Sequence, residues 1–414
     1  MNTMTMKSAL LSVAAVIAVA ASAATTINVD SVVQRWPWNN KVDITYTVGD
    51  GQDCSSSKFR RIVFTTVIDG TTYTIDGVSD LGASANTGTH TVTWTLPSGV
   101  KRTDCTMSAA IYEADAPSGD DYMVIDLATG AIAYEGLLAT QADSNARYNT
   151  ATYKEDKLVL RKVPAGGPYP TGDSANHGSG NNANTDKNWY TTRDYYIGVF
   201  PVTQAQYKKL MVSNPSTKTT AITGNTILHR PVENVSWNTL RNQSNPTLPI
   251  PAVESSTGTF FQRLNFNTGR YFDLPTEVMF EIAERAGASG EFWWGSGPAA
   301  DYVISSDDDL TDDGSGGKST VAVGSKKANS WGLYDVQGNV LEWCLDDFID
   351  KSDNMASHAD VFTPAWASGT DRRQRGSGTG RLASNTYVFR SSYRGNAGSA
   401  ANGWIGFRVA FIAD

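Results

Sequence analysis

Three cysteines and four histidines are the residues of this 414-residue chain that could act as nucleophiles or bind soft metals. They are Cys54, Cys105, Cys344, His90, His177, His229 and His358. They are scattered, and none has the short spacing that zinc and iron sites use. The sequence also lacks a G-x-S-x-G elbow and a glycine-rich phosphate loop opening a helix. Neighbours in sequence therefore predict no nucleophile and no nucleotide site, although carboxylates could still meet in the folded chain.

Five motifs in the second half of the chain follow one another in a fixed order. They are YYIGVFPVTQAQY (195–207), RPVENVSW (230–237), YFDLPTEVMFEIAERAG (271–287), ANSWGLYDVQGNVLEW (328–343) and IGFRVA (405–410). Residues 158–414 thereby resemble the sulfatase-modifying-factor, or formylglycine-generating-enzyme-like, domain family. The resemblance implies a loop-rich α+β fold related to C-type lectins.

Oxidase members of that family convert a substrate cysteine to formylglycine with a copper ion held by a pair of cysteines. The segment from Gly376 to Arg394 has the length of their active-site segment, but Arg381 and Thr386 stand where the thiols belong. Cu(I) prefers thiolate ligands, which neither side chain supplies. Copper is therefore not expected. The iron-dependent branch of the superfamily needs a histidine triad, and the scattered histidines do not match one.

The resemblance also implies a calcium site in the turn at 332–342. Its ligands would be the carboxylates of Asp335 and Glu342 and the carbonyls of Gly338 and Val340. Oxygen ligands, two of them anionic, suit a hard cation such as Ca²⁺. The alternative is a turn without metal, in which Glu342 caps backbone amides.

Aromatic and small polar residues near the C-terminus form a candidate recognition surface. The candidate contact residues are Arg381, Asn385, Tyr387, Tyr393 and Trp404. Tyrosine and tryptophan interleaved with small polar residues make adaptable binding surfaces. Some proteins of this fold vary this segment to bind diverse ligands, so the resemblance implies a protein or glycan ligand. The alternative places Tyr393 and Trp404 in the core.

Three functions are consistent with these motifs. The first is a ligand-binding or display protein braced by calcium and without a catalytic site. The second is a formylglycine-generating oxidoreductase that acts on an exported sulfatase through ligands the sequence does not reveal. The third is a structural surface component in which the first domain is a spacer.

Helix signals place two of the motifs on capped helices. Thr203 is a predicted N-cap for a helix through Met211, and Thr276 is one for a helix that Gly287 ends. Cys344 follows Glu342 and Trp343 in an apolar stretch, which favours a lone buried thiol over a nucleophile.

Alternating apolar and β-branched residues in the first part of the chain predict strands near 42–48, 61–67 and 90–96. Turn residues separate them at intervals typical of an all-β immunoglobulin-like sandwich. We expect this sandwich over 24–155 and the second domain over 156–414. Within the second domain, the Gly/Asn/Ser-rich stretch 166–188 is a predicted mobile loop.

Cys54 and Cys105 both fall in the first domain, which makes a disulfide between them the expected pairing in an exported protein. The bond would stabilise the domain by roughly 4 kcal/mol on the chain-entropy model. Two free thiols are the alternative.

Residues 1–23 have the layout of a secretory signal: Lys7, an apolar run over 9–21, and small residues at the cleavage site. The run is too short to cross a bilayer, and no later stretch predicts a membrane span. We therefore expect a secreted, periplasmic or cell-surface protein. The formal net charge of −8 and the absence of a Lys/Arg-rich block argue against nucleic acid as a partner.

Overall fold

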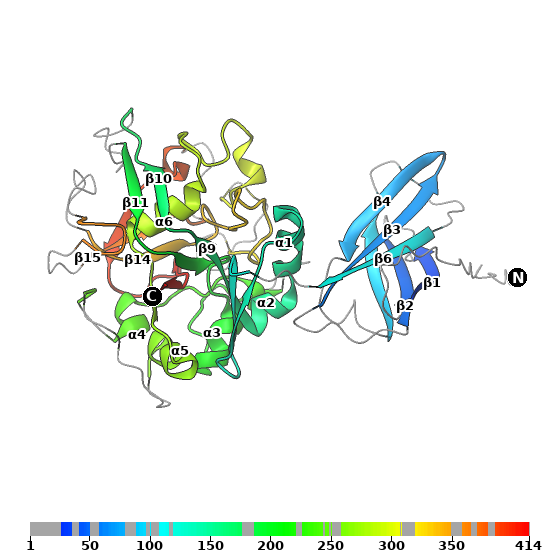
Figure 1. Ribbon diagram of the computed structural model, residues 1–414, viewed down its shortest axis with the longest axis horizontal. Coiled ribbons are helices and arrows are strands. Elements are labelled where there is room, and N and C mark those ends of the chain that lie inside the picture. Colours follow the sequence, from blue (N-terminus) through cyan, green and yellow to red (C-terminus); the bar gives the residue numbers. More distant parts are fainter. Residues whose placement is uncertain are drawn as a thin grey trace, which may run out of the picture. The chain divides into compact units, whose positions relative to one another are not determined.

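The computed structural model divides the chain into two compact units, Met1–Pro117 and Ser118–Asp414 (Figure 1). The residues that it describes are 26–34, 41–49, 58–78, 88–96, 100, 107–115, 119–175, 186–220, 226–242, 245–247, 250, 258–306, 308, 319–348, 358–365, 371–379 and 386–413. The predicted signal at 1–23 and the predicted disulfide partners Cys54 and Cys105 lie outside these residues.

The first unit contains two antiparallel three-stranded sheets, in the orders β1-β2-β5 and β4-β3-β6. Their strands are β1 (Thr26–Gln34), β2 (Lys41–Gly49), β3 (Lys58–Ile68), β4 (Thr71–Val78), β5 (Gly88–Thr95) and β6 (Met107–Asp115). One apolar core draws on both sheets, and the rings of Tyr46 and Phe64 meet across it at 5.2 Å. The predicted strands are confirmed; the immunoglobulin-like topology remains a proposal.

The second unit is built on a six-stranded antiparallel sheet in the order β13-β18-β12-β9-β7-β8. Its strands are β7 (Tyr122–Asp126), β8 (Ile132–Glu135), β9 (Lys157–Val163), β12 (Tyr195–Gly198), β13 (Phe272–Asp273) and β18 (Ala410–Ile412). The start of the first family motif on β12 thus pairs with β18, which begins at Ala410, the end of the last motif.

The boundary between the units differs from the expected one near 155. β7 pairs with β9 and with β8, so residues 122–135 belong to the sheet of the second unit. Most residues of β7 are apolar and buried, a pattern that also suits a strand of the first domain. The sheet therefore begins before the segment that carries the family motifs.

A second sheet and a hairpin complete the strands of this unit. The four-stranded sheet has the order β16-β15-β14-β17, and the hairpin pairs β10 with β11. Their bounds are β10 (Gly166–Thr171), β11 (Lys187–Thr191), β14 (Leu341–Asp347), β15 (Asp371–Arg375), β16 (Gly395–Gly398) and β17 (Ile405–Gly406). The ends of the predicted mobile loop 166–188 are therefore paired strands, because backbone pairing does not need apolar side chains; residues 176–185 lie outside the described part.

The helices are short, and several of them begin at a side-chain N-cap. They are α1 (Gln141–Tyr148), α2 (Ala151–Glu155), α3 (Gln204–Met211), η2 (Ile227–His229), α4 (Trp237–Arg241), α5 (Phe260–Thr268), α6 (Glu277–Arg285), η3 (Ala299–Asp301) and η4 (Thr386–Phe389). The predicted N-caps Thr203 and Thr276 are confirmed. Each hydroxyl accepts a hydrogen bond from the backbone N–H of the third residue of its helix. Among the described residues, no helix combines the length and the apolar character that crossing a membrane requires.

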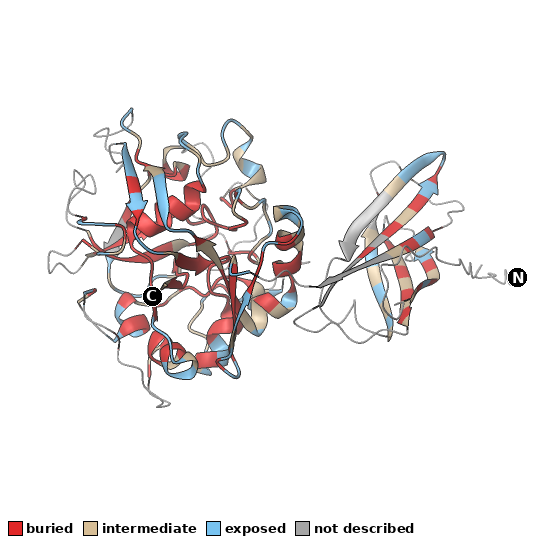
Figure 2. Cartoon of the chain, viewed as in Figure 1, coloured by how far each residue is buried: buried red, intermediate tan, exposed pale blue. Residues whose placement is uncertain are grey.

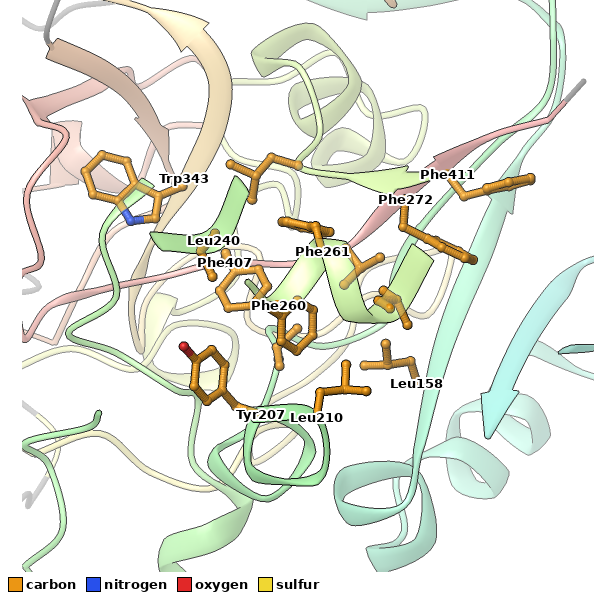
Figure 3. Packing of buried hydrophobic residues seen from close by; sticks show 14 of the residues in the cluster. Leu158, Tyr207, Leu210, Leu240, Phe260, Phe261, Phe272, Trp343, Phe407 and Phe411 are labelled. Atoms are coloured by element: carbon orange, nitrogen blue, oxygen red, sulfur yellow. The ribbon is translucent and has the colours of Figure 1, made fainter. Parts of the chain in front are cut away.

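Aromatic side chains fill the largest core of the second unit. Figure 3 shows Phe260 and Phe261 of α5 meeting Phe407, with ring centroids 5.0 and 5.8 Å from it. Tyr207 of α3 stacks on Phe260 at 5.6 Å. Helix α6 differs from the others because all nine of its residues are buried (Figure 2), its three glutamates included. Those buried carboxylates must be neutralised or paired within the fold.

Candidate functional site

The first part of the candidate site is a cluster of aromatic rings beside η4. Tyr387 lies in η4, and Tyr393 lies in the turn that follows it. Both rings pack against a small core of apolar residues, Val303, Val388 and Phe389. Three further half-buried rings pack on the same core: Phe292, Trp294 and Tyr302. We call these five rings the aromatic cluster.

Three rings of the aromatic cluster form a stacked column. The centroids of Phe292 and Trp294 are 4.9 Å apart, and those of Trp294 and Tyr302 are 5.6 Å apart, with interplanar angles of 23° and 11°. Trp293 stands edge-on to the column, 5.4 Å from Trp294. The ammonium of Lys327 lies 5.2 Å from the centroid of Tyr302. Partly exposed aromatic rings with nearby polar groups are suited to binding apolar faces of a ligand.

The structure brings together two of the five predicted contact residues. The ring centroids of Tyr387 and Tyr393 are 6.3 Å apart. Trp404 is not in the aromatic cluster; its ring lies 3.8 Å from the ammonium of Lys218. Tyr393 and Trp404 are both half-buried, so neither is the fully buried core residue that was the alternative. Arg381, Asn385 and the side chain of Thr386 lie outside the described part of the chain.

Polar contacts fix the turn at 390–393 to the rest of the unit. Arg390 forms an ion pair with Glu291, whose carbonyl accepts a hydrogen bond of 3.0 Å from the amide of Ser391. Nη1 of Arg375 donates to the carbonyl of Tyr393 at 2.7 Å. The aromatic cluster therefore sits on a turn held by backbone as well as side-chain contacts.

Glu284 of α6 lies directly behind this turn. Nε2 of Gln337 donates to Oε1 of Glu284 at 2.8 Å and to the carbonyl of Arg390 at 3.2 Å. Burial raises the pKa of the Glu284 carboxyl to about 8, and the charge of Arg375 offsets burial only in part. Glu284 is therefore a protonated, neutral acid at neutral pH.

A second cluster of titratable groups lies at the N-terminal end of α6. Glu277, Asp346 and His358 each bring one possible ligand atom within 4.8 Å of the others, so their geometry could hold a metal ion. Nε2 of His358 is 3.3 Å from Oε1 of Glu277 and 3.3 Å from Oδ1 of Asp346. Nδ1 lies 3.2 Å from the carbonyl of Thr363, to which it can only donate. An imidazolium, which donates from both nitrogens, satisfies all three acceptors.

Two arginines already neutralise this cluster. Nε of Arg394 donates to Oε2 of Glu277 at 2.7 Å, Nη2 of Arg394 donates to Oε1, and Nε of Arg373 lies 3.8 Å from Oε1. Burial raises the pKa of Glu277, but the two guanidinium groups outweigh burial and hold this pKa well below its usual range. Burial lowers the pKa of His358, but Asp346 and Glu277 outweigh it and raise this pKa. A divalent cation would add charge to a buried cluster whose carboxylates are already paired, which favours the imidazolium over a metal.

The turn predicted to bind calcium is compact and buried. Asp335 and Gly338 have φ values of 51° and 86°. A Cβ at Gly338 would lie 2.5 Å from backbone atoms of Ile304, so this position requires glycine. Oδ2 of Asp335 accepts from the amide of Gly324 at 2.8 Å, and the carbonyl of Gly338 accepts from the amide of Val340 at 2.8 Å.

Arg408 supplies positive charge to this turn. Its Nε and Nη2 each lie 2.7 Å from one carboxylate oxygen of Glu342. Glu342 therefore fits a calcium ion poorly while this ion pair is closed. Asp335 fits better, because burial raises the pKa of its carboxyl to about 6 and the amide of Gly324 and the charge of Arg408 offset burial only in part. A cation at Asp335 would relieve that cost.

Cys344 is fully buried in β14, and burial raises the pKa of its thiol well above the ordinary value. The prediction of a lone buried thiol is confirmed, because Cys344 is unpaired and has no access to solvent. A thiol held in this neutral form is a poor metal ligand and a poor nucleophile.

Two features of the site were absent from the sequence-based predictions. The run FWW at 292–294 was a visible signal for an aromatic surface, but its contact with η4 depends on a fold that joins residues about 90 positions apart. Glu284 appears in the sequence as one more acidic residue of an amphipathic helix. Its burial follows from the packing of α6 on every side.

Comparisons with known proteins agree on the second unit. The family model described as "Sulfatase-modifying factor enzyme 1-like domain" matches residues 150–413. A curated relative, the "Chaperone protein LppX" of Paenibacillus barcinonensis, is 29% identical over 242 residues, which cover 52% of this chain and 78% of the relative.

Two solved structures are similar over most of their own length. PvdO from Pseudomonas aeruginosa is 23% identical with a TM-score of 0.46, covering 62% of this chain and 94% of that chain. The Treponema denticola variable protein 1 is 23% identical with a TM-score of 0.43, covering 62% of this chain and 96% of that chain.

Proposed function

We propose that this chain, which belongs to the family of sulfatase-modifying factor enzyme 1-like domains, is an exported, non-catalytic binding protein that recognises its ligand through the aromatic cluster and the segment at 379–401. The observation that supports the proposal is the aromatic cluster, whose five half-buried rings pack together beside η4. By the family resemblance, Arg381 and Thr386 stand in the same segment at the positions of the copper thiols.

Cys344 cannot take the place of the pair of copper-binding cysteines. Cys344 is buried, and its raised pKa keeps it as a neutral thiol, whereas Cu(I) is bound by thiolates. A formylglycine-generating oxidase remains the alternative that the experiment below decides. The third function, a structural surface component, has no described contact in its favour.

A polypeptide is the preferred ligand class within this proposal. Stacked Phe and Trp rings flanked by Lys327 and by the Arg390–Glu291 ion pair resemble the mixed aromatic and charged surfaces that bind proteins. A curated relative is named a chaperone, a class of protein that acts on polypeptides. The first unit, as an immunoglobulin-like sandwich, would act as a spacer.

The proposed calcium site has fewer ligands than the site that the family resemblance implies. The carboxylate of Asp335 and the carbonyls of Gly338 and Val340 would hold the ion, and Glu342 would join them only if its ion pair with Arg408 opens. The role of the ion would be to neutralise a buried carboxylate and brace the turn.

The proposal is tested with the purified chain in two assays. In the first, copper(I), oxygen and a Cys-x-Pro-x-Arg peptide are added, and mass spectrometry looks for an aldehyde; we expect none. In the second, a peptide array and a glycan array are probed with the wild type, with Trp294→Ala and with Trp331→Ala. Trp331 is a matched control, because it is half-buried but packs in a different core.

We expect peptides to be retained by the wild type and by Trp331→Ala but lost by Trp294→Ala. Retention of glycans with the same dependence on Trp294 would support recognition and change the ligand class. Conversion of the peptide cysteine to an aldehyde would overturn the proposal, and so would binding that is indifferent to Trp294.

A further inference from the structure

The turn at 390–393 is held from behind by two buried side chains, Gln337 and Arg375. Nε2 of Gln337 donates to the carbonyl of Arg390 at 3.2 Å. Nη2 of Arg375 donates to the carbonyl of Ser391 at 3.3 Å, and Nη1 donates to that of Tyr393 at 2.7 Å. Because Tyr393 belongs to the aromatic cluster, these contacts fix where one of its rings lies.

Glu284 faces both of the side chains that hold the turn. Its Oε1 accepts a hydrogen bond of 2.8 Å from Nε2 of Gln337, the atom that also contacts the turn. Among the charges that act on the carboxyl of Glu284, that of Arg375 is the strongest. The two are not paired, because the guanidinium of Arg375 forms its ion pair with Glu281. One carboxyl is therefore placed to influence both supports of the turn.

Two buried polar atoms of this group have no hydrogen-bond partner among the described residues. They are Oε2 of Glu284, an acceptor when the carboxyl is ionised, and Nε of Arg375, a charged donor. A buried polar atom without a partner costs free energy. A rearrangement that brings these two atoms together is therefore favoured once Glu284 carries a charge.

The other charged groups around Glu284 already have partners. On its own helix, Arg285 pairs with Glu281, with Nε 2.9 Å from Oε1. In the turn, the side chain of Arg390 pairs with the exposed Glu291. Strand β10, which also packs on α6, carries no acidic or basic residue. The acidic residues of β14 are paired as well: Glu342 with Arg408, Asp346 with His358, and Asp347 with Arg372. The arginine behind the turn is therefore the cation that an ionised carboxylate would attract.

Ionisation of Glu284 would redirect Arg375. A hydrogen bond between two ionised groups is roughly twice as strong as one between neutral groups, so a carboxylate competes well against peptide carbonyls. The guanidinium would therefore leave the carbonyls of Ser391 and Tyr393. Burial raises the pKa of Glu284 to about 8, and Arg375 offsets burial only in part, so the carboxyl is protonated at neutral pH and the exchange of partners belongs to alkaline solution.

We propose that ionisation of Glu284 releases the turn at 390–393, so that the aromatic cluster binds its ligand near neutral pH and loses it in alkaline solution. The sign follows from linkage: the released turn pairs Glu284 with Arg375, which favours the charged carboxylate, so the released turn gains as pH rises. The ligand in this proposal rests on the proposed function. The release of the turn does not, because it is measured on the free protein.

Hydrogen exchange of the free protein tests the release. Mass spectrometry follows the amides of 386–394 in the wild type and in Glu284→Gln, which keeps an acceptor for Gln337 and cannot ionise. The two proteins are compared at the same pH, so that the intrinsic exchange rate cancels. They should exchange equally at pH 6.5, and the wild type should exchange at least about tenfold faster at pH 9, one unit above the pKa. Equal rates at both pH values overturn the proposal.

Two controls separate a local release from unfolding. The first is dilute urea at pH 9: exchange through a local opening hardly responds, because little surface is exposed, whereas exchange through unfolding accelerates. The second is Glu155→Gln, which changes a partly exposed glutamate paired with His229 and should exchange like the wild type. If the wild-type rate at 386–394 rises with urea, or if Glu155→Gln removes the pH dependence, the release is not local to Glu284 and the proposal is overturned.

Recognition is measured with the peptide that the array retains most strongly. Its affinity for the wild type, from fluorescence anisotropy of the labelled peptide, should fall about tenfold between pH 6.5 and pH 9, because only the fraction with a held turn binds. The affinity of Glu284→Gln should stay constant. An equal fall in both proteins overturns the link between Glu284 and recognition. If the array retains no peptide, the proposed function fails, and hydrogen exchange alone decides whether Glu284 controls the turn.

Discussion

Arg408 and Glu342 form a buried two-pronged ion pair in which Nε and Nη2 each lie 2.7 Å from a carboxylate oxygen. Both side chains have no exposed surface. Arg408 also donates to the carbonyls of Gly198 and Tyr334, at 2.9 and 3.1 Å. A residue of the last family motif thus ties the glycine turn to the first motif, so the fold depends on this contact.

Replacing Arg408 by Met should destabilise the protein by about 3–5 kcal/mol, because Glu342 would be left as an unpaired buried charge. The double variant Arg408→Met with Glu342→Leu should be more stable than the single variant, because no charge is then stranded. Urea unfolding followed by tryptophan fluorescence measures both. As a control, Lys209→Met breaks an exposed ion pair with Asp156 and should cost less than about 1 kcal/mol. If Arg408→Met is as stable as the wild type, the prediction that this buried ion pair stabilises the fold is wrong.

Glu284→Gln should stabilise the protein at alkaline pH. Burial raises the pKa of this carboxyl in the fold to about 8, from an ordinary value of 4.5, so the folded chain binds a proton that the unfolded chain has released. The stability of the wild type must therefore fall as pH rises from about 4.5 to 8, by about 1.4 kcal/mol per unit of pKa difference at most. Glu284→Gln has no carboxyl to titrate at this position, so its stability should not fall in this way.

Urea unfolding at pH 5 and pH 9 tests the prediction. The two proteins should be close in stability at pH 5, and the variant should exceed the wild type at pH 9 by a few kcal/mol. Glu291→Gln is the matched control: it replaces a partly exposed glutamate and should leave the pH dependence unchanged. Parallel pH profiles for Glu284→Gln and the wild type would show that Glu284 is ionised in the fold.

His358 should titrate above its ordinary pKa and should not respond to metal. Burial lowers its pKa, but the carboxylates of Asp346 and Glu277 outweigh burial, so the protonated ring contributes stability that is fully present below pH 6.5 and is lost as pH rises through the raised pKa. NMR of the imidazole measures that pKa directly. Zn²⁺ should leave the signal unchanged, because Arg394 and Arg373 already neutralise Glu277. A shift on adding Zn²⁺, reversed by EDTA, would show a metal site instead.

Much of the fold was predictable because local signals and the family motifs agree with it. Thr203 and Thr276 cap their helices as predicted, since an N-cap is a contact between residues three apart. The second compact unit begins before the boundary expected near 155, for the opposite reason. β7 is assigned to the second unit by pairing with β9, and such pairing leaves no mark in the residues of β7 themselves.

The candidate site was predictable only in part. Tyr387 and Tyr393 were identified from composition, whereas the rings of Phe292, Trp294 and Tyr302 join them through tertiary packing. The turn predicted to bind calcium was also predictable only in part. The sequence contains both Glu342 and Arg408, but only the fold shows that the guanidinium occupies both carboxylate oxygens.

Calcium should raise the melting temperature of the wild type, and Asp335 should be required for the effect. Ca²⁺ bound to the folded chain alone stabilises it by mass action, and the ion would neutralise a carboxylate whose pKa burial raises to about 6. The increase should therefore shrink as pH falls below about 6, because protons compete for the same oxygens. Thermal unfolding of EGTA-treated protein, with and without Ca²⁺, gives the measurement.

Asp335→Asn should abolish the increase, whereas Asp308→Asn should keep it. Asp308 is a matched control, because it lies in the acidic run at 307–313 and is paired with Lys326. If Ca²⁺ leaves the melting temperature of the wild type unchanged, Arg408 alone neutralises the turn and calcium has no part in this protein. If Asp308→Asn loses the increase and Asp335→Asn does not, the ion binds the acidic run, and the turn at 332–342 is braced without it.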